Sequence, residues 1–176
     1  KIGMKKYHDD EMFILESIRQ INSTSPMVIT EEAISKGIEL AEIEQGFKYN
    51  EEQKNAIIKM ATNNFSTLRG KAGVGKSSTA RGILKVCEQM GYSIHVASFS
   101  AKASVRASET TGFKSSTLHR LLGLGKGMKS GSKFVEYDVL FVDECVLNPL
   151  YLMKAIFKGI NLSKTKIILC ADTRQL

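Results

Sequence analysis

The sequence predicts an α/β fold in which helices cover both faces of a parallel β-sheet. Three observations lead to this prediction. Strand-like segments alternate with helix-like segments from about residue 50 onward, two of the strand-like segments are almost wholly apolar, and a glycine-rich turn joins the first strand to the next helix. Strands that alternate with helices are linked by right-handed crossovers and become parallel, and strands covered on both faces are continuous apolar runs.

The first 46 residues predict a small helical module ahead of the α/β domain. Apolar residues recur at helical spacing from Asp9 to Ile21, and a polar run then ends the pattern. A second helix is expected from the hydroxyl cap at Thr30 to Gly46. The pair is similar in outline to a helix-turn-helix, but this segment is acidic, which favours a packing role over reading DNA.

Residues 47–176 predict one α/β domain. A helix should open at Asn50, which is a good N-cap followed by two acidic residues. The expected strands are 65–69, 93–98, 137–142 and 166–171, and the later helices are 76–90, 101–109, 118–122 and 150–157. Residues 123–133 contain four glycines and no periodicity, so a flexible loop or thin hairpin is expected there.

Charge is distributed unevenly along the chain. The net charge is +7, but residues 1–49 carry −3 and residues 50–176 carry +10. A basic surface confined to one part indicates a polyanionic partner, most simply nucleic acid, and the alternative is a lysine-rich solubilising face. The three cysteines form no CxxC pair, and neither a signal peptide nor a membrane-spanning run is found, so a reduced cytoplasmic protein is expected.

A glycine-rich run after the first predicted strand matches a phosphate-binding loop. Residues 70–77 read Gly-Lys-Ala-Gly-Val-Gly-Lys-Ser and fit the pattern G-x-x-x-x-G-K-[ST] at every fixed position. Glycines let the loop fold tightly and present backbone N–H groups to phosphate oxygens, and the following helix adds the positive end of its dipole. Lys76 would reach the β- and γ-phosphates of ATP, and the Ser77 hydroxyl would bind Mg²⁺. The nucleotide-binding residues predicted here are Gly70, Ala72, Gly73, Val74, Gly75, Lys76, Ser77 and Ser78.

A second motif supplies the acids that hydrolysis requires. The apolar run 139–142 ends in Asp143 and Glu144. A carboxylate at the tip of a parallel strand can hold Mg²⁺ through water, so Asp143 is expected beside Ser77. Glu144 is expected to polarise the attacking water as a general base.

The ordered set of motifs resembles the first motor domain of superfamily 1 DNA helicases, in their RecD-like branch. The phosphate loop and the acidic pair are similar to motifs I and II, which many NTPases share. Residues 49–53 resemble the adenine-binding Q motif, and residues 96–103 resemble motif Ia. More discriminating are the run Ser-Thr-Leu-His-Arg-Leu-Leu-Gly at 116–123 and the terminal 171–176, which resembles motif III.

This resemblance implies a RecA-like fold and further site residues. Gln53 would pair its amide with the adenine edge, because it offers a donor and an acceptor together. Gln175 would sense the γ-phosphate and couple it to DNA. The catalytic residues implied are therefore Lys76, Glu144 and Gln175. Candidates for contacts to single-stranded DNA are Lys102, Thr117 and His119. The alternatives are an exposed helix lysine at Lys102 and a histidine that caps local backbone at His119. Phe99 could stack on a base, but an aromatic residue after a strand is more often part of the core.

The sequence departs from the family pattern at two positions, and the resemblance has further implications. Ala171 stands where motif III usually has glycine and Val146 where serine is common, and neither change removes a group that the chemistry needs. The branch implies 5′ to 3′ movement along single-stranded DNA. It also implies a second RecA-like domain with a phosphate-stabilising arginine, which we expect to be absent from this chain.

Two other functions compete with the ATP-driven motor. One is a P-loop kinase or NTPase that does not act on nucleic acid, which would leave the run 116–123 and the basic part of the chain unexplained. The other is a catalytically silent helicase-like docking module, as in conjugative relaxases. A decayed site of that kind should have lost one of the four groups Lys76, Asp143, Glu144 and Gln175, and all are present.

Overall fold

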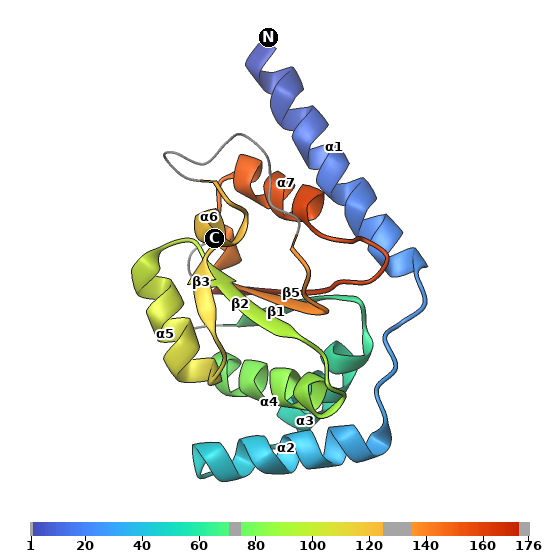
Figure 1. Cartoon of the computed structure of the whole chain (residues 1–176), viewed down its shortest axis with the longest axis vertical. Helices are drawn as coiled ribbons and strands as arrows, with labels where there is room; N and C mark the ends of the chain where they lie inside the picture. Colours follow the sequence, from blue (N-terminus) through green and yellow to red (C-terminus); the bar gives the residue numbers. More distant parts are fainter. Residues whose placement is uncertain (1, 71–74, 125–134, 173–176) are drawn as a thin grey trace.

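The computed structural model of the chain describes residues 2–70, 75–124 and 135–172 (Figure 1). The helices in these ranges are α1 (Ile2–Ser23), α2 (Glu31–Gln45), α3 (Glu51–Thr62), α4 (Lys76–Gln89), α5 (Ala101–Thr111), α6 (Leu118–Leu121) and α7 (Leu150–Gly159), with a short 3₁₀ turn η1 (Cys145–Leu147). The strands are β1 (Phe65–Gly70), β2 (Ile94–Ser98), β3 (Ser115–Thr117), β4 (Val139–Asp143) and β5 (Lys166–Asp172).

These strands form one parallel sheet in the order β1-β5-β4-β2-β3. The apolar strands β4 and β5 lie inside the sheet, as expected for strands that are covered on both faces. Their side chains alternate, so that Phe141 faces one core while Leu140 and Val142 face the other. The predicted α/β fold, with helices on both faces of a parallel sheet, is confirmed.

Each face of the sheet has its own apolar core (Figure 1). Helices α2, α3 and α4 cover one face, where Ile57 and Ile83 are fully buried near Phe141. Helices α1, α6 and α7 cover the other face, where Ile21 and Ile156 are fully buried. Helix α5 packs against β2 and β3 at one side of the sheet.

The two N-terminal helices lie on opposite faces of the sheet, although the sequence suggests one module for the first 46 residues (Figure 1). Helix α1 packs on α7, where Lys154 pairs with the buried Asp10 and lies 5.7 Å from the centre of the Phe13 ring. Helix α2 packs on α4. Each helix therefore covers its apolar face with the α/β domain, and the two do not form a packing unit of their own.

The capping residues that the sequence predicts mark both ends of α2 and the start of α3. The Thr30 hydroxyl accepts a hydrogen bond from the Ala33 N–H, and Gly46 closes α2 in the left-handed region with φ +79°. Asn50 opens α3 in a capping box with Gln53, which satisfies two of the exposed amides at this helix start.

Two differences from the predicted elements have a local explanation. Strand β3 was not expected, because Ser115–Thr117 is short and polar and joins the sheet through backbone pairing with β2 alone. Helix α1 begins at Ile2, well before the apolar repeat that indicated it. Most of the glycine-rich segment 123–133 lies outside the described residues. No helix in the described part of the chain is long and apolar enough to cross a membrane.

The register of the sheet brings the carboxyl ends of its strands into one row. Gly70 is paired with Asp172, and Ser98 is paired with both Asp143 and Thr117. Loops that leave these ends therefore emerge side by side at one edge, which is where open α/β sheets bind their ligands.

The close packing of α2 on α4 depends on a glycine. A Cβ atom at Gly37 would lie 2.6 Å from the Val86 Cα atom and 2.7 Å from the Val86 N atom. We expect Gly37→Ala to lower the free energy of unfolding by about 1–3 kcal/mol, because backbone must move to admit the methyl group.

Thermal unfolding followed by circular dichroism measures this effect, and Ser35→Ala at an exposed position of the same helix is the control. Helix propensity alone would make Gly37→Ala stabilising by roughly 1 kcal/mol. A raised melting temperature in Gly37→Ala would therefore contradict the close approach of the two helices.

Candidate functional site

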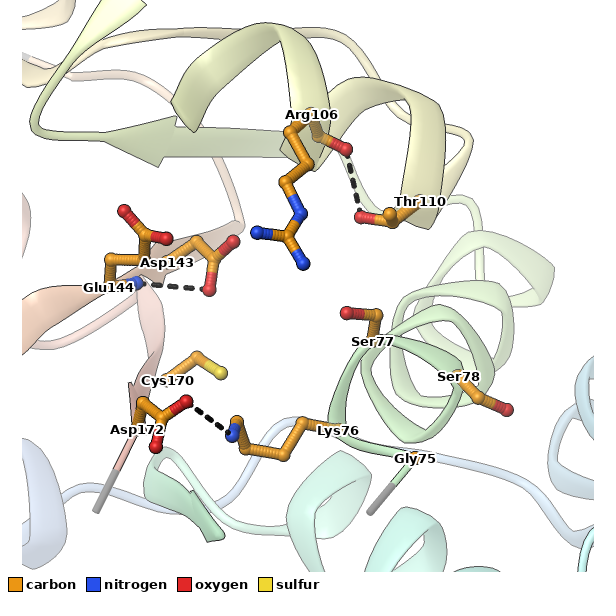
Figure 2. Close-up of a pocket in the computed structure, with 10 residues that line it drawn as sticks. All are labelled: Gly75, Lys76, Ser77, Ser78, Arg106, Thr110, Asp143, Glu144, Cys170 and Asp172. Carbon is orange, nitrogen blue, oxygen red and sulfur yellow. Dashed lines mark hydrogen bonds and ion pairs between the residues drawn. The ribbon is translucent and has the colours of Figure 1, made fainter. Parts of the chain in front are cut away.

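A cavity of about 510 Å³ opens at the carboxyl edge of the sheet (Figure 2). Four elements form its walls: the start of α4, the face of α5, and the ends of β4 and β5. The lining residues are Gly75, Lys76, Ser77, Ser78, Arg106, Thr110, Asp143, Glu144, Cys170 and Asp172. The predicted phosphate loop and acidic pair thus meet in one space, although more than 60 residues separate them in the sequence.

Gly75 is held in a conformation and a space that only glycine fits. It caps α4 with φ +82°, in the left-handed region that disfavours side chains. A Cβ atom here would also lie 2.6 Å from the Gln53 Nε2 atom. The close contact places the Q-motif-like segment directly against the phosphate loop. The predicted binding residues Ala72, Gly73 and Val74 lie outside the described residues.

Lys76 directs its ammonium group into the cavity (Figure 2). Its Nζ atom donates a hydrogen bond of 2.5 Å to the Gly70 carbonyl and lies 3.5 Å from the Asp172 Oδ2 atom. Only 14% of the side chain is exposed, so the charge is largely shielded from water. Because a shielded charge interacts strongly, Lys76 is well placed to attract a phosphate group.

Ser77 and Asp143 face one another across the cavity (Figure 2). A serine hydroxyl and a carboxylate are both oxygen ligands of the type that Mg²⁺ prefers, and this ion normally completes its shell with water and phosphate oxygens. The described residues contain no group of three or more His, Cys, Asp or Glu side chains that could hold a metal alone.

The Cys170 thiol lines the same cavity as a neutral group. Burial, and next the nearby Asp143 carboxylate, raise the pKa of this thiol far above its usual value. A thiol that stays protonated is a poor nucleophile. Cys145, beside the acidic pair, also has a raised pKa, mainly through burial. Both cysteines act as small space-filling groups here.

Glu144 is the only residue other than glycine with a positive φ in the described part of the chain. Its φ of 51° and ψ of 40° lie in the left-handed region, which costs a side-chain-bearing residue about 1 kcal/mol. The Glu144 N–H donates to Asp143 Oδ1 over 2.9 Å, which offsets part of this cost and fixes the Asp143 carboxylate. The turn ends β4 abruptly and brings the second carboxylate to the cavity wall instead of extending the strand (Figure 2).

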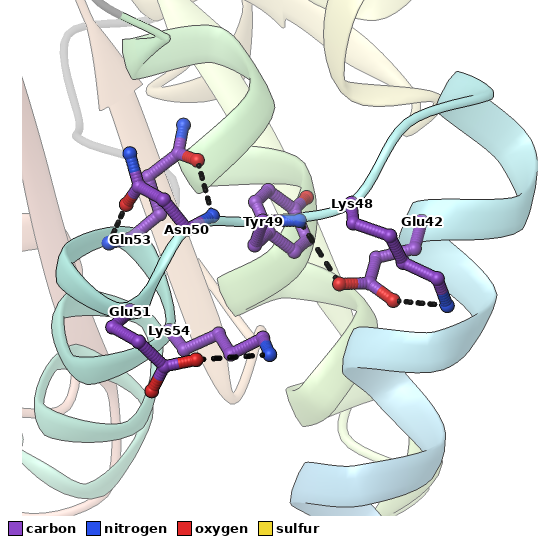
Figure 3. Close-up of polar contacts among 7 residues, drawn as sticks. All are labelled: Glu42, Lys48, Tyr49, Asn50, Glu51, Gln53 and Lys54. Atoms are coloured by element: carbon purple, nitrogen blue, oxygen red, sulfur yellow. Dashed lines mark hydrogen bonds and ion pairs between the residues drawn. The ribbon is translucent and has the colours of Figure 1, made fainter.

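The segment before α3 is anchored to both neighbouring helices (Figure 3). Glu42 of α2 accepts hydrogen bonds from the Tyr49 N–H at 2.9 Å and from Lys48 Nζ at 2.7 Å. The bond from Lys48, the largest cause, keeps the pKa of Glu42 below its ordinary value. The buried Tyr49 hydroxyl donates to the Ser78 carbonyl of α4 over 2.7 Å. The segment is thereby tied to the first turn of the helix that follows the phosphate loop.

The side-chain amide of Gln53 is partly occupied by a contact within the chain. Its Oε1 atom accepts the Asn50 N–H over 3.1 Å, and its Nε2 atom faces Gly75. A carbonyl oxygen has a second lone pair, so Gln53 can still accept from an adenine amino group. Ser78 turns its hydroxyl away from the cavity and donates to Gln45 Oε1 over 2.5 Å (Figure 2). Adenine contact by Gln53 and nucleotide binding by Ser78 stay predictions.

The three candidates for DNA contacts come from the same edge of the sheet. Thr117 ends β3, and its hydroxyl accepts the Arg120 N–H over 3.2 Å as the cap of α6. His119 bonds the Tyr151 hydroxyl over 3.2 Å, and its ring lies 6.0 Å from that of Phe99. The Phe99 ring is half-buried against the second core, as expected. Lys102 is exposed in the first turn of α5. These contacts with DNA stay predictions.

Sequence reasoning did not identify Arg106, Thr110 or Asp172 as site residues. Arg106 and Thr110 are four residues apart on α5, so they share the face that forms one wall of the cavity. Asp172 ends β5 in register with Gly70, much as Asp143 ends β4. The position of Asp172 at the end of an apolar strand could have indicated it. Gln175 lies outside the described residues.

Three comparisons with known proteins agree with this geometry. A protein family described as "AAA domain" matches residues 48–176. The ATP-dependent RecD2 DNA helicase of Deinococcus radiodurans is 32% identical over 129 residues, which are 72% of this chain and 18% of that protein. The UvsW helicase of bacteriophage T4 shares the fold, with a TM-score of 0.55 and 14% identity, over 70% of this chain and 52% of that one.

The matches cover different shares of the chain and of its relatives. The chain spans about a fifth of RecD2 and about half of the UvsW chain, so what those whole proteins do is not thereby a property of this chain. The family match, in contrast, covers almost three quarters of the chain, and it contains the phosphate loop, the acidic pair and every strand of the sheet. The chain therefore belongs to this AAA domain family, and residues 48–176 have a RecA-like P-loop fold that resembles the motor domain of the RecD-like superfamily 1 helicases.

Proposed function

We propose that this chain binds ATP with Mg²⁺ and provides half of a motor that hydrolyses ATP while moving 5′ to 3′ along single-stranded DNA. The observation that carries the proposal is the meeting of Lys76, Ser77, Asp143 and Glu144 in one cavity. The four groups come from two separate stretches of sequence, and each has the chemistry that one part of phosphoryl transfer to water needs.

Each residue has a distinct task in this proposal. Lys76 neutralises charge on the β- and γ-phosphates, and the N-terminus of α4 adds its backbone N–H groups. Ser77 and Asp143 would hold Mg²⁺, which neutralises phosphate charge and orients the oxygens when it is bound. Glu144 accepts a proton from the attacking water. The left-handed turn at Glu144 supports this assignment, because strained backbone is concentrated at functional sites.

Single-stranded DNA is the proposed partner at the same edge of the sheet. Residues 50–176 carry a net charge of +10. Lys102 follows β2, which is next to β4, whereas Thr117 ends β3 and His119 follows it, on the other side of β2. The name of the Deinococcus relative, a DNA helicase, supports DNA as the nucleic acid. The segments after β2 and β3 would then contact the strand while the segment after β4 contacts the nucleotide.

The division of the chain also belongs to the proposal. We infer an accessory segment at residues 1–46 and a motor domain from residue 47, because the family match begins at residue 48. We further infer that a second RecA-like domain supplies the arginine that stabilises charge on the transferred phosphoryl group. Gln175 would couple the γ-phosphate to DNA.

Removal of the Lys76 charge tests nucleotide binding. We expect Lys76→Ala to weaken ATP binding and to abolish turnover in the full-length protein, because a charge-assisted contact to phosphate is lost. Titration with a fluorescent ATP analogue measures binding, and phosphate release measures turnover. Lys59→Gln on α3 is the matched control, because it removes an exposed positive charge that does not line the cavity. Hydrolysis by Lys76→Ala at the wild-type rate would show that the site is elsewhere.

Glu144→Gln separates hydrolysis from binding. The amide keeps the shape of the side chain but cannot accept a proton, so we expect ATP affinity within about threefold of wild type and turnover reduced at least ~100-fold. Steady-state phosphate release and equilibrium titration of the same preparation measure the two quantities. Near wild-type turnover in Glu144→Gln would require another general base.

The proposed DNA surface is tested by salt and by a double substitution. Binding to an oligo-dT strand should weaken steeply as salt rises, because Lys and Arg displace counterions from phosphates. Lys102→Gln combined with Thr117→Ala should weaken it further and leave ATP binding intact. Loss of the Thr117 cap costs about 1 kcal/mol of stability, so melting temperatures are compared first. Affinity that does not change with salt would favour an NTPase that does not act on nucleic acid.

A further inference from the structure

The α5 wall of the nucleotide cavity carries a positive charge that none of the recognised motifs supplies. Arg106 extends from α5 into the cavity, and Figure 2 shows its guanidinium group between Asp143 and Ser77. Lys76 enters the same space from the opposite wall (Figure 2). Phosphate groups bound at the loop would therefore lie between two cationic side chains.

The charge of the cavity favours a second cationic side chain beside Lys76, in addition to the proposed Mg²⁺. The lining holds two basic side chains, Lys76 and Arg106, and three acidic ones, so its formal charge is −1. The Lys76 ammonium group also lies 3.5 Å from Asp172, which offsets part of its charge. Without Arg106 the lining would be −2, and a triphosphate, itself strongly negative, would meet greater repulsion.

The wall that carries Arg106 is fixed to the helix that follows the phosphate loop. Arg81 of α4 donates from its Nε and Nη2 atoms to the Thr110 carbonyl, at 3.1 Å and 2.8 Å. The Thr110 hydroxyl in turn donates to the Arg106 carbonyl over 2.9 Å. Because the last turn of α5 is tied to α4, the fold holds the backbone of Arg106 in a fixed position relative to α4.

We propose that Arg106 binds the terminal phosphate of ATP from the α5 side of the cavity and makes this site prefer ATP over ADP. The terminal phosphate is assigned because Ser77 and Asp143, which flank the guanidinium, mark the proposed Mg²⁺ position, and Glu144 beside them marks the attacking water. Arginine suits this contact, since its planar fork can donate two parallel hydrogen bonds to phosphate oxygens. The inference rests on the proposed function, because it requires ATP to bind at this loop.

The test compares ATP and ADP binding in single variants of the full-length protein. Fluorescent ATP and ADP analogues are titrated, with Mg²⁺ present, into wild type, Arg106→Gln and Arg106→Lys. We expect Arg106→Gln to weaken ATP binding about tenfold and ADP binding less than about threefold, because a charged hydrogen-bond donor to the third phosphate is lost. Arg106→Lys should fall between, since it keeps the charge and loses the fork.

Two controls separate this result from a structural effect. Arg19→Gln removes an arginine whose side chain is 70% exposed on α1 and paired with the exposed Glu16, and it should leave both affinities unchanged. Arg81→Gln breaks the α4–α5 brace, so it should also reduce the preference for ATP while Arg106 remains. Melting temperatures of Arg106→Gln and wild type should agree, because Arg106 is exposed.

The failures of the two proposals are distinguishable. If wild type binds neither nucleotide and Lys76→Ala changes nothing, the proposed function itself is wrong. If wild type binds ATP in a Lys76-dependent way and Arg106→Gln binds ATP equally well, only the inference on Arg106 is overturned. A loss shared equally by ATP and ADP would also overturn it, since the contact would then not involve the third phosphate.

Discussion

The register of the parallel strands is the constraint on which the candidate site depends. Ser98 pairs with Asp143 and with Thr117, and Gly70 pairs with Asp172, so the strands end together along one edge. A shift of one residue in β4 would exchange the two faces of the strand, and Phe141 would leave the core that it now fills. The two apolar cores therefore fix the position of the acidic pair.

Local backbone geometry then turns the functional groups toward the cavity. Gly75 and Glu144 both adopt left-handed conformations, one at the start of α4 and the other directly after β4. At Gly75 this conformation costs little, whereas at Glu144 it must be sustained by the surrounding fold. The bond from the Glu144 N–H to Asp143 Oδ1 and the 3₁₀ turn that follows hold this arrangement. Packing of the sheet thus supports a strained turn at the place where the hydrolytic base is proposed.

Helix α2 links the N-terminal segment to the nucleotide cavity. Its Glu42 holds the Tyr49 N–H, and Tyr49 holds the Ser78 carbonyl in the first turn of α4. Gln45 of the same helix accepts the Ser78 hydroxyl. The Q-motif-like segment is therefore clamped between α2 and α4, with Gln53 close to Gly75. Although it precedes the family match, α2 therefore helps to hold the first turn of α4.

The sequence by itself determined the α/β class, nearly every helix and strand, and the two motifs whose residues line the cavity. It could do so because caps such as Thr30 and Asn50, apolar runs and the phosphate-loop glycines are local signals. Only the tertiary structure placed α1 and α2 on opposite faces, since amphipathic helices do not encode which partner covers them. Only the tertiary structure also showed that Ser115–Thr117 forms strand β3 and that Arg106 lines the cavity. An exposed arginine on a helix has no sequence signature, because its neighbours across the cavity are set by the crossover of α5 and the register of β4.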